Sequence, residues 1–175
     1  EHERIVFNGN GYSEEWPVEA EKRGLPNCKS IVDAIPALVD DTTVEMYEKF
    51  NVLSKAELEA REDILFEQYA GVRNIEALTM IEMANKMIIP AAVKYTKKLA
   101  DTVIAVKEAG ADASVQADML SEVSGKLAEM KTAVKALEEV TAKAADAECI
   151  KCKAEEYKDD VMAAMAELRK PADEL

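Results

Sequence analysis

The sequence is poor in the residues that make turns. It has 175 residues but only 6 Gly and 5 Pro, and only 5% of its residues are aromatic. An all-β fold needs many Gly- and Pro-rich turns and collagen needs regularly spaced glycine, so both are excluded. The 28 alanines enrich the chain in the best helix former, and we therefore predict an all-α fold.

Cysteine and long apolar runs are also scarce. Cys28, Cys149 and Cys152 are an odd and sparse set, which fits a reducing cytoplasm better than a disulfide scaffold. No run of about 18 uncharged apolar residues and no signal peptide is recognisable, so we expect a cytoplasmic protein without a membrane span. Because the first residue is Glu1 rather than Met, we also expect a piece of a longer chain.

The chain has fewer basic than acidic residues. The chain has 22 Lys and Arg against 35 Asp and Glu, a formal net charge of −13 at pH 7. Nucleic acids and anionic membranes recruit basic patches, so we expect neither as a partner. With 49% hydrophobic and 33% charged residues, the composition is that of a folded domain rather than of a disordered acidic tail.

The composition divides the chain into two parts. Residues 1–53 hold 6 of the 11 Gly and Pro residues and 5 of the 9 aromatic residues, whereas residues 54–175 hold 25 of the 28 alanines. We predict that residues 1–53 are irregular, with short helices. Residues 54–175 are predicted to form an antiparallel bundle of about three long helices.

Turn signals subdivide the first part. Arg4–Asn8 is β-prone and is followed by a turn sequence, which leaves room for one short strand. Ser13 is the expected N-cap of a helix that ends at Gly24. Further along, Pro36 limits its neighbourhood to a turn or two of helix, and Thr43 is expected to cap a short helix.

The second part begins with a capping box, Ser54 and Glu57. A helical pattern then continues to Ala109, with Pro90 expected to kink it and Gly110 to end it. The segment from Ile75 to Val93 is apolar nearly all round, so burial on several sides is expected. The predicted inward face of the first half consists of Leu58, Leu65, Tyr69, Val72 and Ile75.

The last third contains two apolar registers that do not match. One register includes Leu120 to Leu137 and the other Ile150 to Leu168, with the slip near Asp146. We predict a turn at residues 145–148, with Asp146 as a candidate cap. A continuous helix with a stutter is the alternative.

The strongest chemical motif is Cys149-Ile-Lys-Cys152. A zinc site needs four ligands, and only Cys28 and the lone His2 could join it from far away in the sequence. A thioredoxin-like pair needs a βαβ setting, whereas the surroundings here are helical. Structural or incidental thiols are therefore the favoured interpretation, with a redox or zinc protein as a minor alternative.

The other candidates point to structure rather than chemistry. Gly9-Asn-Gly11 is interpreted as a turn, and His2 lacks a nucleophile context. The carboxylate pairs Glu155-Glu156 and Asp159-Asp160 alternate with lysines, as on a solvated helix face. Three methionines at helical spacing are interpreted as gap-fillers of the core: Met80, Met83 and Met87. Trp16, with Phe7 and Tyr12, is interpreted as an anchor of the first part on the long helices. No catalytic, cofactor-binding or metal-ligating residue is predicted.

Several stretches resemble the C-terminal region of type III glutamine synthetases. Arg4–Trp16 and Glu19–Asn27 look like the end of that family's catalytic region. The similarity covers almost the whole chain in the same order as in the family, and it is weak over residues 110–151. The further matching segments are Asn74–Ala84, Ile88–Pro90, Val161–Arg169 and Ala172–Leu175. The departures are Pro17, the two cysteines of the Cys-x-x-Cys motif, and the end at Leu175, where the family continues through a tail containing Trp and Pro.

The resemblance implies a bacterial-type enzyme that joins glutamate and ammonia at the expense of ATP, with Mg²⁺ or Mn²⁺. The family's ATP, glutamate and metal ligands lie upstream of the matched region, so no catalytic residue can be carried over to this chain. The expected role of the chain is structural: packing on the rest of the parent enzyme and supporting a homo-oligomeric ring. The alternative is a free-standing helical module that binds a partner helix.

Overall fold

A computed structural model describes residues 3–175, so the expectation for His2 lies outside the described residues. The described residues contain helices and no strand, which confirms the all-α prediction. None of these helices combines the length and the apolar character that a membrane crossing requires. The elements are η1 (Glu3–Ile5), α1 (Glu15–Lys22), α2 (Ile31–Ala34), η2 (Ile35–Leu38), α3 (Asp41–Lys49), α4 (Lys55–Met83), η3 (Ala84–Ile88), α5 (Ile89–Glu108), α6 (Ser114–Ala145), α7 (Ile150–Glu156), η4 (Tyr157–Val161) and α8 (Met162–Glu174).

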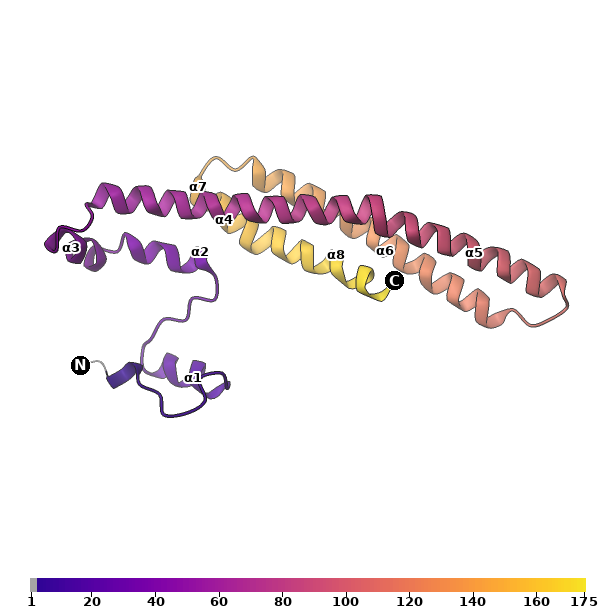
Figure 1. Cartoon of the computed structure of the whole chain (residues 1–175), viewed down its shortest axis with the longest axis horizontal. Coiled ribbons are helices and arrows are strands. Elements are labelled where there is room, and N and C mark those ends of the chain that lie inside the picture. Colours follow the sequence, from indigo (N-terminus) through magenta and orange to yellow (C-terminus); the bar gives the residue numbers. More distant parts are fainter. Residues whose placement is uncertain (1–2) are drawn as a thin grey trace.

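The long helices form an antiparallel bundle (Figure 1). α4, η3 and α5 make one rod, α6 runs back along it, and α7, η4 and α8 form a third, shorter rod. α6 packs against α5 near one end and against α8 near the other, while α7 packs on α4. α5 and α6 extend as a two-helix hairpin past the C-terminus, and α1 lies apart from the long helices.

Three helix ends agree with the sequence signals. Ser54 donates its backbone N–H and its hydroxyl to the Glu57 carboxylate, each at 2.8 Å, as the predicted capping box requires. Gly24 and Gly110 have positive φ angles of 67° and 75°, a conformation that favours glycine and ends a helix. The rod from Lys55 to Glu108 continues through the proline position, as predicted.

The first and third rods each contain a π-helical segment. The first, η3, ends at Ile88, two residues before Pro90, which has no backbone N–H and would clash with the carbonyl one turn earlier in a regular helix. The second, η4, joins α7 to α8. Each π-turn takes up one extra residue, so the side-chain register shifts without ending the helix.

Three local predictions for residues 1–53 are wrong. The β-prone run from Arg4 begins with the 3-10 turn η1 instead of a strand. The Ser13 hydroxyl does not cap α1, because it donates to the Asn10 carbonyl at 2.8 Å. α3 is capped by Asp40 rather than Thr43: the Asp40 carboxylate accepts the Thr42 N–H at 3.0 Å. An aspartate in this position binds the free N–H groups of a first turn, and its short side chain competes well with that of threonine.

The slip near Asp146 is a turn, so the alternative of one continuous helix is wrong. α6 ends at Ala145 and α7 begins at Ile150. Asp146 occupies the C-cap position of α6, while Cys149 is the N-cap of α7.

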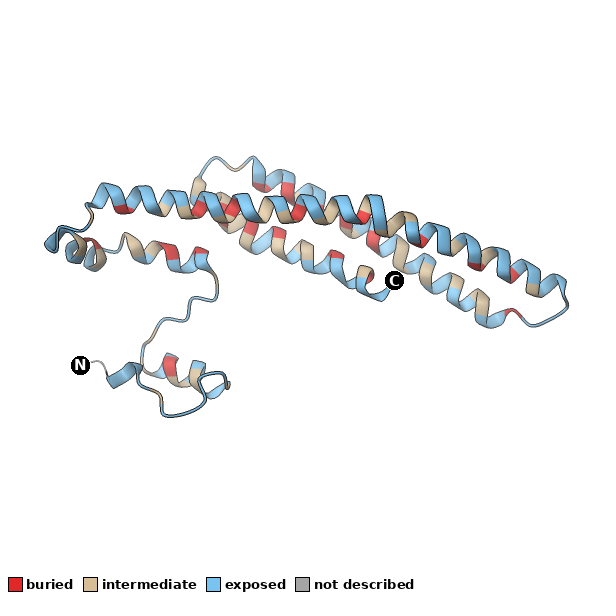
Figure 2. Ribbon diagram, in the orientation of Figure 1, coloured by how far each residue is buried: buried red, intermediate tan, exposed pale blue. Residues whose placement is uncertain are grey.

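The inward face of α4 differs from the predicted one. Leu58 is buried as expected, but Val72 and Ile75 are 51% and 66% exposed. Alanines take the inward positions instead, and they pack with Val134, Leu137 and Leu168 of the facing helices (Figure 2). The buried residues of α4 and η3 are Leu58, Phe66, Ala70, Ala77 and Ala84.

The apolar belt from Ile75 to Val93 is therefore buried on one side only. Met80 packs against the core, but Met83 and Met87 are 46% and 62% exposed, so they are not core gap-fillers in this chain. Small residues on the inner side allow the helices to approach closely, which leaves the bulky side chains of the belt on the outer side.

Ala77→Leu should destabilise the chain by about 1–3 kcal/mol, because Ala77 is fully buried and three extra carbon atoms have no space there. Urea denaturation monitored by circular dichroism measures the change. Ala91→Leu, at an exposed position of α5, is the control and should change the free energy of unfolding by less than about 0.5 kcal/mol. Equal effects of the two variants would contradict the packing described here.

Candidate functional site at the junction of α7 and the N-terminal segment

α7 joins the N-terminal segment to the long helices through a small apolar cluster. Ala154 of α7 is completely buried against Val32 of α2, Ile35 of η2 and Phe66 of α4. Ile150, at the start of α7, packs against the edge of the same cluster. Three segments that are far apart in the sequence therefore depend on each other for burial.

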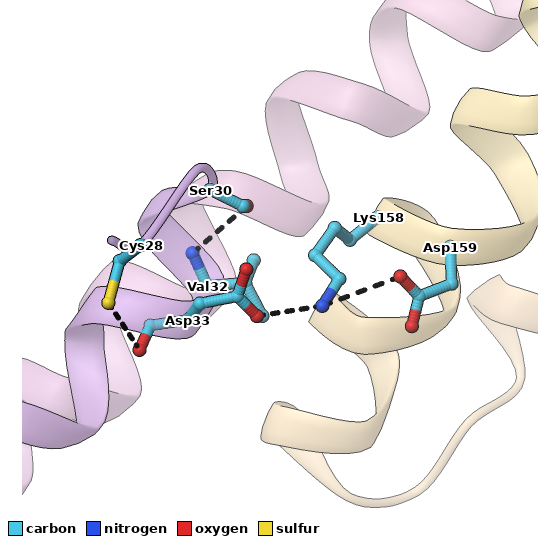
Figure 3. A network of polar contacts seen from close by, with 6 residues as sticks. All are labelled: Cys28, Ser30, Val32, Asp33, Lys158 and Asp159. Atoms are coloured by element: carbon cyan, nitrogen blue, oxygen red, sulfur yellow. Dashed lines mark hydrogen bonds and ion pairs between the residues drawn. The ribbon is translucent and has the colours of Figure 1, made fainter. Parts of the chain in front are cut away.

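An ion pair fixes the same junction at the surface (Figure 3). The Lys158 ammonium of η4 lies 2.8 Å from the Asp33 carboxylate of α2 and 3.4 Å from that of Asp159. The hydrogen bond to Asp33 raises the pKa of Lys158. On the other side of α2, the Ser30 hydroxyl accepts the Val32 N–H at 3.3 Å, and the Cys28 thiol donates to the Asp33 carbonyl at 3.7 Å.

A buried tyrosine lies beside this junction. The Tyr157 hydroxyl donates to Asn74 Oδ1 at 3.0 Å, and burial raises the pKa of Tyr157. A cavity of about 270 Å³ opens between α4 and the start of α7, with Glu67, Glu148 and Lys153 in its wall. None of these side chains forms a nucleophile–base pair with another, so the cavity offers a polar recess rather than a catalytic arrangement.

The structure corrects the interpretation of the Cys-x-x-Cys motif. Cys149 and Cys152 form a disulfide, whereas the sequence favoured structural or incidental thiols. Cys149 Sγ also accepts the Cys152 N–H at 3.1 Å. Cys28 is a free, exposed cysteine and does not join the pair.

Three of the four carboxylates of the pairs Glu155-Glu156 and Asp159-Asp160 pair with lysines. Lys143 lies 3.7 Å from Glu156 and 3.4 Å from Asp160, and Lys158 contacts Asp159. Among residues 3–175, no group of three or more His, Cys, Asp and Glu side chains could hold a metal ion. Glu156, Asp159 and Asp160 thus serve as partners of lysines.

The aromatic residues of the first part pack locally. The Phe7 and Trp16 rings lie 4.8 Å apart, and the Arg23 guanidinium lies 5.8 Å from the Trp16 ring. Arg23 also donates to the carbonyls of Arg4 and Val6 at 3.2 and 2.7 Å. Tyr12 is fully exposed, and α1 lies apart from the long helices, so the expected anchoring role of these aromatic residues is wrong.

No direct signal in the sequence marked Asp33, Asn74, Tyr157 and Lys158 as junction residues. Asp33 and Lys158 are 125 positions apart, and Asn74 and Tyr157 are 83 positions apart. Only the register of Ile150, Ala154 and Tyr157 indicated that this side of α7 faces inward.

Comparison with known proteins identifies the family. A protein-family model described as "Glutamine synthetase C-terminal domain" matches residues 1–107, more than half of the chain. The chain belongs to this glutamine synthetase family. The resemblance seen in the sequence is thereby confirmed.

Relatives extend the match beyond residue 107. A glutamine synthetase from Butyrivibrio fibrisolvens is 37% identical over 99% of the chain, and one from Bacteroides fragilis is 27% identical over 99%. A type-3 glutamine synthetase from Dictyostelium discoideum is 36% identical over 59% of the chain, so the family is not confined to bacteria. The chain spans 25% of the length of the Butyrivibrio and Bacteroides proteins and 14% of the length of the Dictyostelium protein.

Tyr157→Phe should lower the free energy of unfolding by about 1 kcal/mol at pH 8, because Asn74 Oδ1 loses its donor. The raised pKa means that the unfolded state loses the tyrosine proton first, so the stability contributed by Tyr157 is complete below pH ~10 and is lost as the pH rises through the folded-state pKa. Urea titrations at a series of pH values should therefore show the wild-type advantage shrinking above pH ~10. A constant difference up to that pH and beyond would contradict the assignment.

Proposed function

We propose that the chain is the C-terminal, non-catalytic helical part of a type III glutamine synthetase, a cytoplasmic ligase that forms glutamine from glutamate and ammonia with ATP hydrolysis. The family match and the names of the three relatives support this proposal. The role of this part is to pack on the rest of the parent enzyme and to support its assembly into a homo-oligomer.

The observation that carries the structural role is an exposed apolar stripe on α4. Ile64, Val72, Ile75 and Leu78 are each more than half exposed, and they lie on the side of the helix opposite the buried alanines. At about 100° per residue these positions share one face. Contiguous exposed apolar side chains usually mark a surface that another protein surface covers.

The matched relatives suggest what covers this stripe. Each is at least four times longer than the segment it shares with this chain, so most of such an enzyme lies outside residues 1–175. The covering surface is then another part of the same polypeptide or a second subunit. Both would bury the stripe without help from an unrelated partner.

ATP and Mg²⁺ or Mn²⁺ belong to the proposed parent enzyme rather than to this part. The described residues offer no cluster of acidic or histidine ligands for a divalent metal, and Glu156 and Asp160 pair with Lys143. Residues 3–175 therefore supply no set of side chains that fits a metal–nucleotide complex.

The assembly role predicts that charge on the stripe disrupts the oligomer. In the full-length enzyme, Ile75→Glu with Leu78→Glu should shift the particle mass to smaller species, because two carboxylates would be buried without partners. Light scattering measures the mass, and a glutamine-formation assay measures activity.

Thr132→Glu, at an exposed position of α6 away from the stripe, is the matched control and should leave the mass unchanged. If the stripe variant keeps the mass and activity of the control, the stripe does not contribute to assembly. If the stripe variant binds a separate protein less well but assembles normally, the free-standing interaction module would replace the proposal.

The non-catalytic role predicts that the isolated chain forms no glutamine. The purified 175-residue chain, mixed with glutamate, ammonia, ATP and Mg²⁺, should give no product above a protein-free blank, with the full-length enzyme as the positive control. Product formation that scales with the concentration of the isolated chain would disprove the role.

A further inference from the structure

The disulfide lies at the start of α7, within reach of solvent. Cys149 and Cys152 are both exposed, and their Cα atoms are 5.1 Å apart. This separation is within the range of roughly 4.4–6.8 Å that disulfides require, so the bond needs no rearrangement of the backbone. Small thiols and disulfides in solution can reach both sulfur atoms.

The disulfide spans the turn that presents α7 to the junction. Lys153 donates its N–H to the Cys149 carbonyl at 2.8 Å, which closes the first turn of the helix. Ile150, between the two cysteines, packs on the apolar cluster, and Ala154 lies within it. A covalent link across residues 149–152 therefore holds the turn whose side chains bind the N-terminal segment.

We propose that Cys149 and Cys152 are a reversible dithiol–disulfide site whose oxidation state sets how firmly α7 holds residues 30–38. Val32 and Ile35 are buried in the cluster that also contains Ala154 and Phe66, so a looser first turn of α7 loosens their packing. This proposal rests on the geometry of the junction and does not depend on the proposed function.

The chemistry is thiol–disulfide exchange with a low-molecular-weight disulfide. The thiolate of one cysteine attacks a sulfur of the oxidant, forms a mixed disulfide and releases one thiolate. The second cysteine thiolate attacks the mixed disulfide, forms the Cys149–Cys152 bond and releases the other thiolate. The two cysteines lose two protons and two electrons, and the oxidant is reduced to two thiols; a dithiol reductant reverses the step.

Reduction should increase the frequency with which the first turn opens. The disulfide closes a loop of four residues, and such a loop restricts the open state even though it is short. We expect amide exchange in residues 150–156 to become roughly threefold to tenfold faster in the dithiol form. A smaller acceleration is expected in residues 31–38, whereas the α5–α6 hairpin should exchange at the same rate in both forms.

The experiment is hydrogen exchange with mass spectrometry on the full-length protein, equilibrated in buffers of reduced and oxidised glutathione. Digestion with pepsin keeps the two cysteines on one peptide, which a protease specific for lysine would divide at Lys151. The mass of this peptide gives the fraction of the disulfide, and the same samples give the exchange rates.

Two variants provide the controls. Cys28→Ser should leave both the disulfide and the exchange difference intact, because Cys28 is outside the pair. Cys149→Ser keeps an oxygen acceptor at the N-cap and should exchange like the reduced wild type under all buffers.

Two results would overturn the proposal. One is a peptide that stays in the dithiol form, or carries glutathione on each cysteine, throughout the buffer series. The other is an exchange rate in residues 150–156 that is the same in the oxidised and reduced wild-type protein.

Discussion

Close approach of the long helices is the constraint on which the rest of the structure depends. Ala70, Ala77 and Ala84 are buried at seven-residue intervals along the rod of α4 and η3. A seven-residue interval returns to nearly the same side of a helix, so these alanines form a seam of small side chains. Larger residues of the facing helices, including Leu137 and Leu168, fill the space beside the seam. The small side chains of the seam let the facing helices approach α4 closely at these three positions.

The same seam explains why bulky apolar residues remain outside. Where alanine occupies the inner side of α4, the side chains of Val72, Ile75 and Leu78 lie on the opposite side and are exposed. Small residues thus fill the inner side of α4, and larger apolar side chains remain exposed, where another protein surface can cover them. This arrangement of small buried and large exposed apolar side chains suits a part of a larger enzyme better than an independent domain, in which no other surface would cover the exposed apolar residues.

Local signals predicted local features well. Gly24, Gly110 and the Ser54–Glu57 capping box were recognisable because each depends on residues within one turn. The inward face of α4 was predicted wrongly, because periodicity weights bulky apolar residues and undervalues alanine in a closely packed seam. The junction between Asp33 and Lys158 could not be predicted, because no pattern in a single sequence relates positions so far apart. The proposed division at residue 53 remains a prediction, although α3 and η2 both pack on α4.

The end of the third rod determines the mechanical character of the hairpin. Glu174, at the end of α8, pairs with Lys126 of α6 at 2.6 Å, and beyond this contact α5 and α6 continue without a third helix (Figure 1). From Lys126 to Ser114 the helix extends by about 18 Å, at 1.5 Å per residue. A rotation of about 10° at the Glu174 contact would move the tip by about 3 Å. The hairpin thus projects beyond the end of the third rod, and a small motion at the bundle becomes a displacement large enough to make or break contacts at the tip.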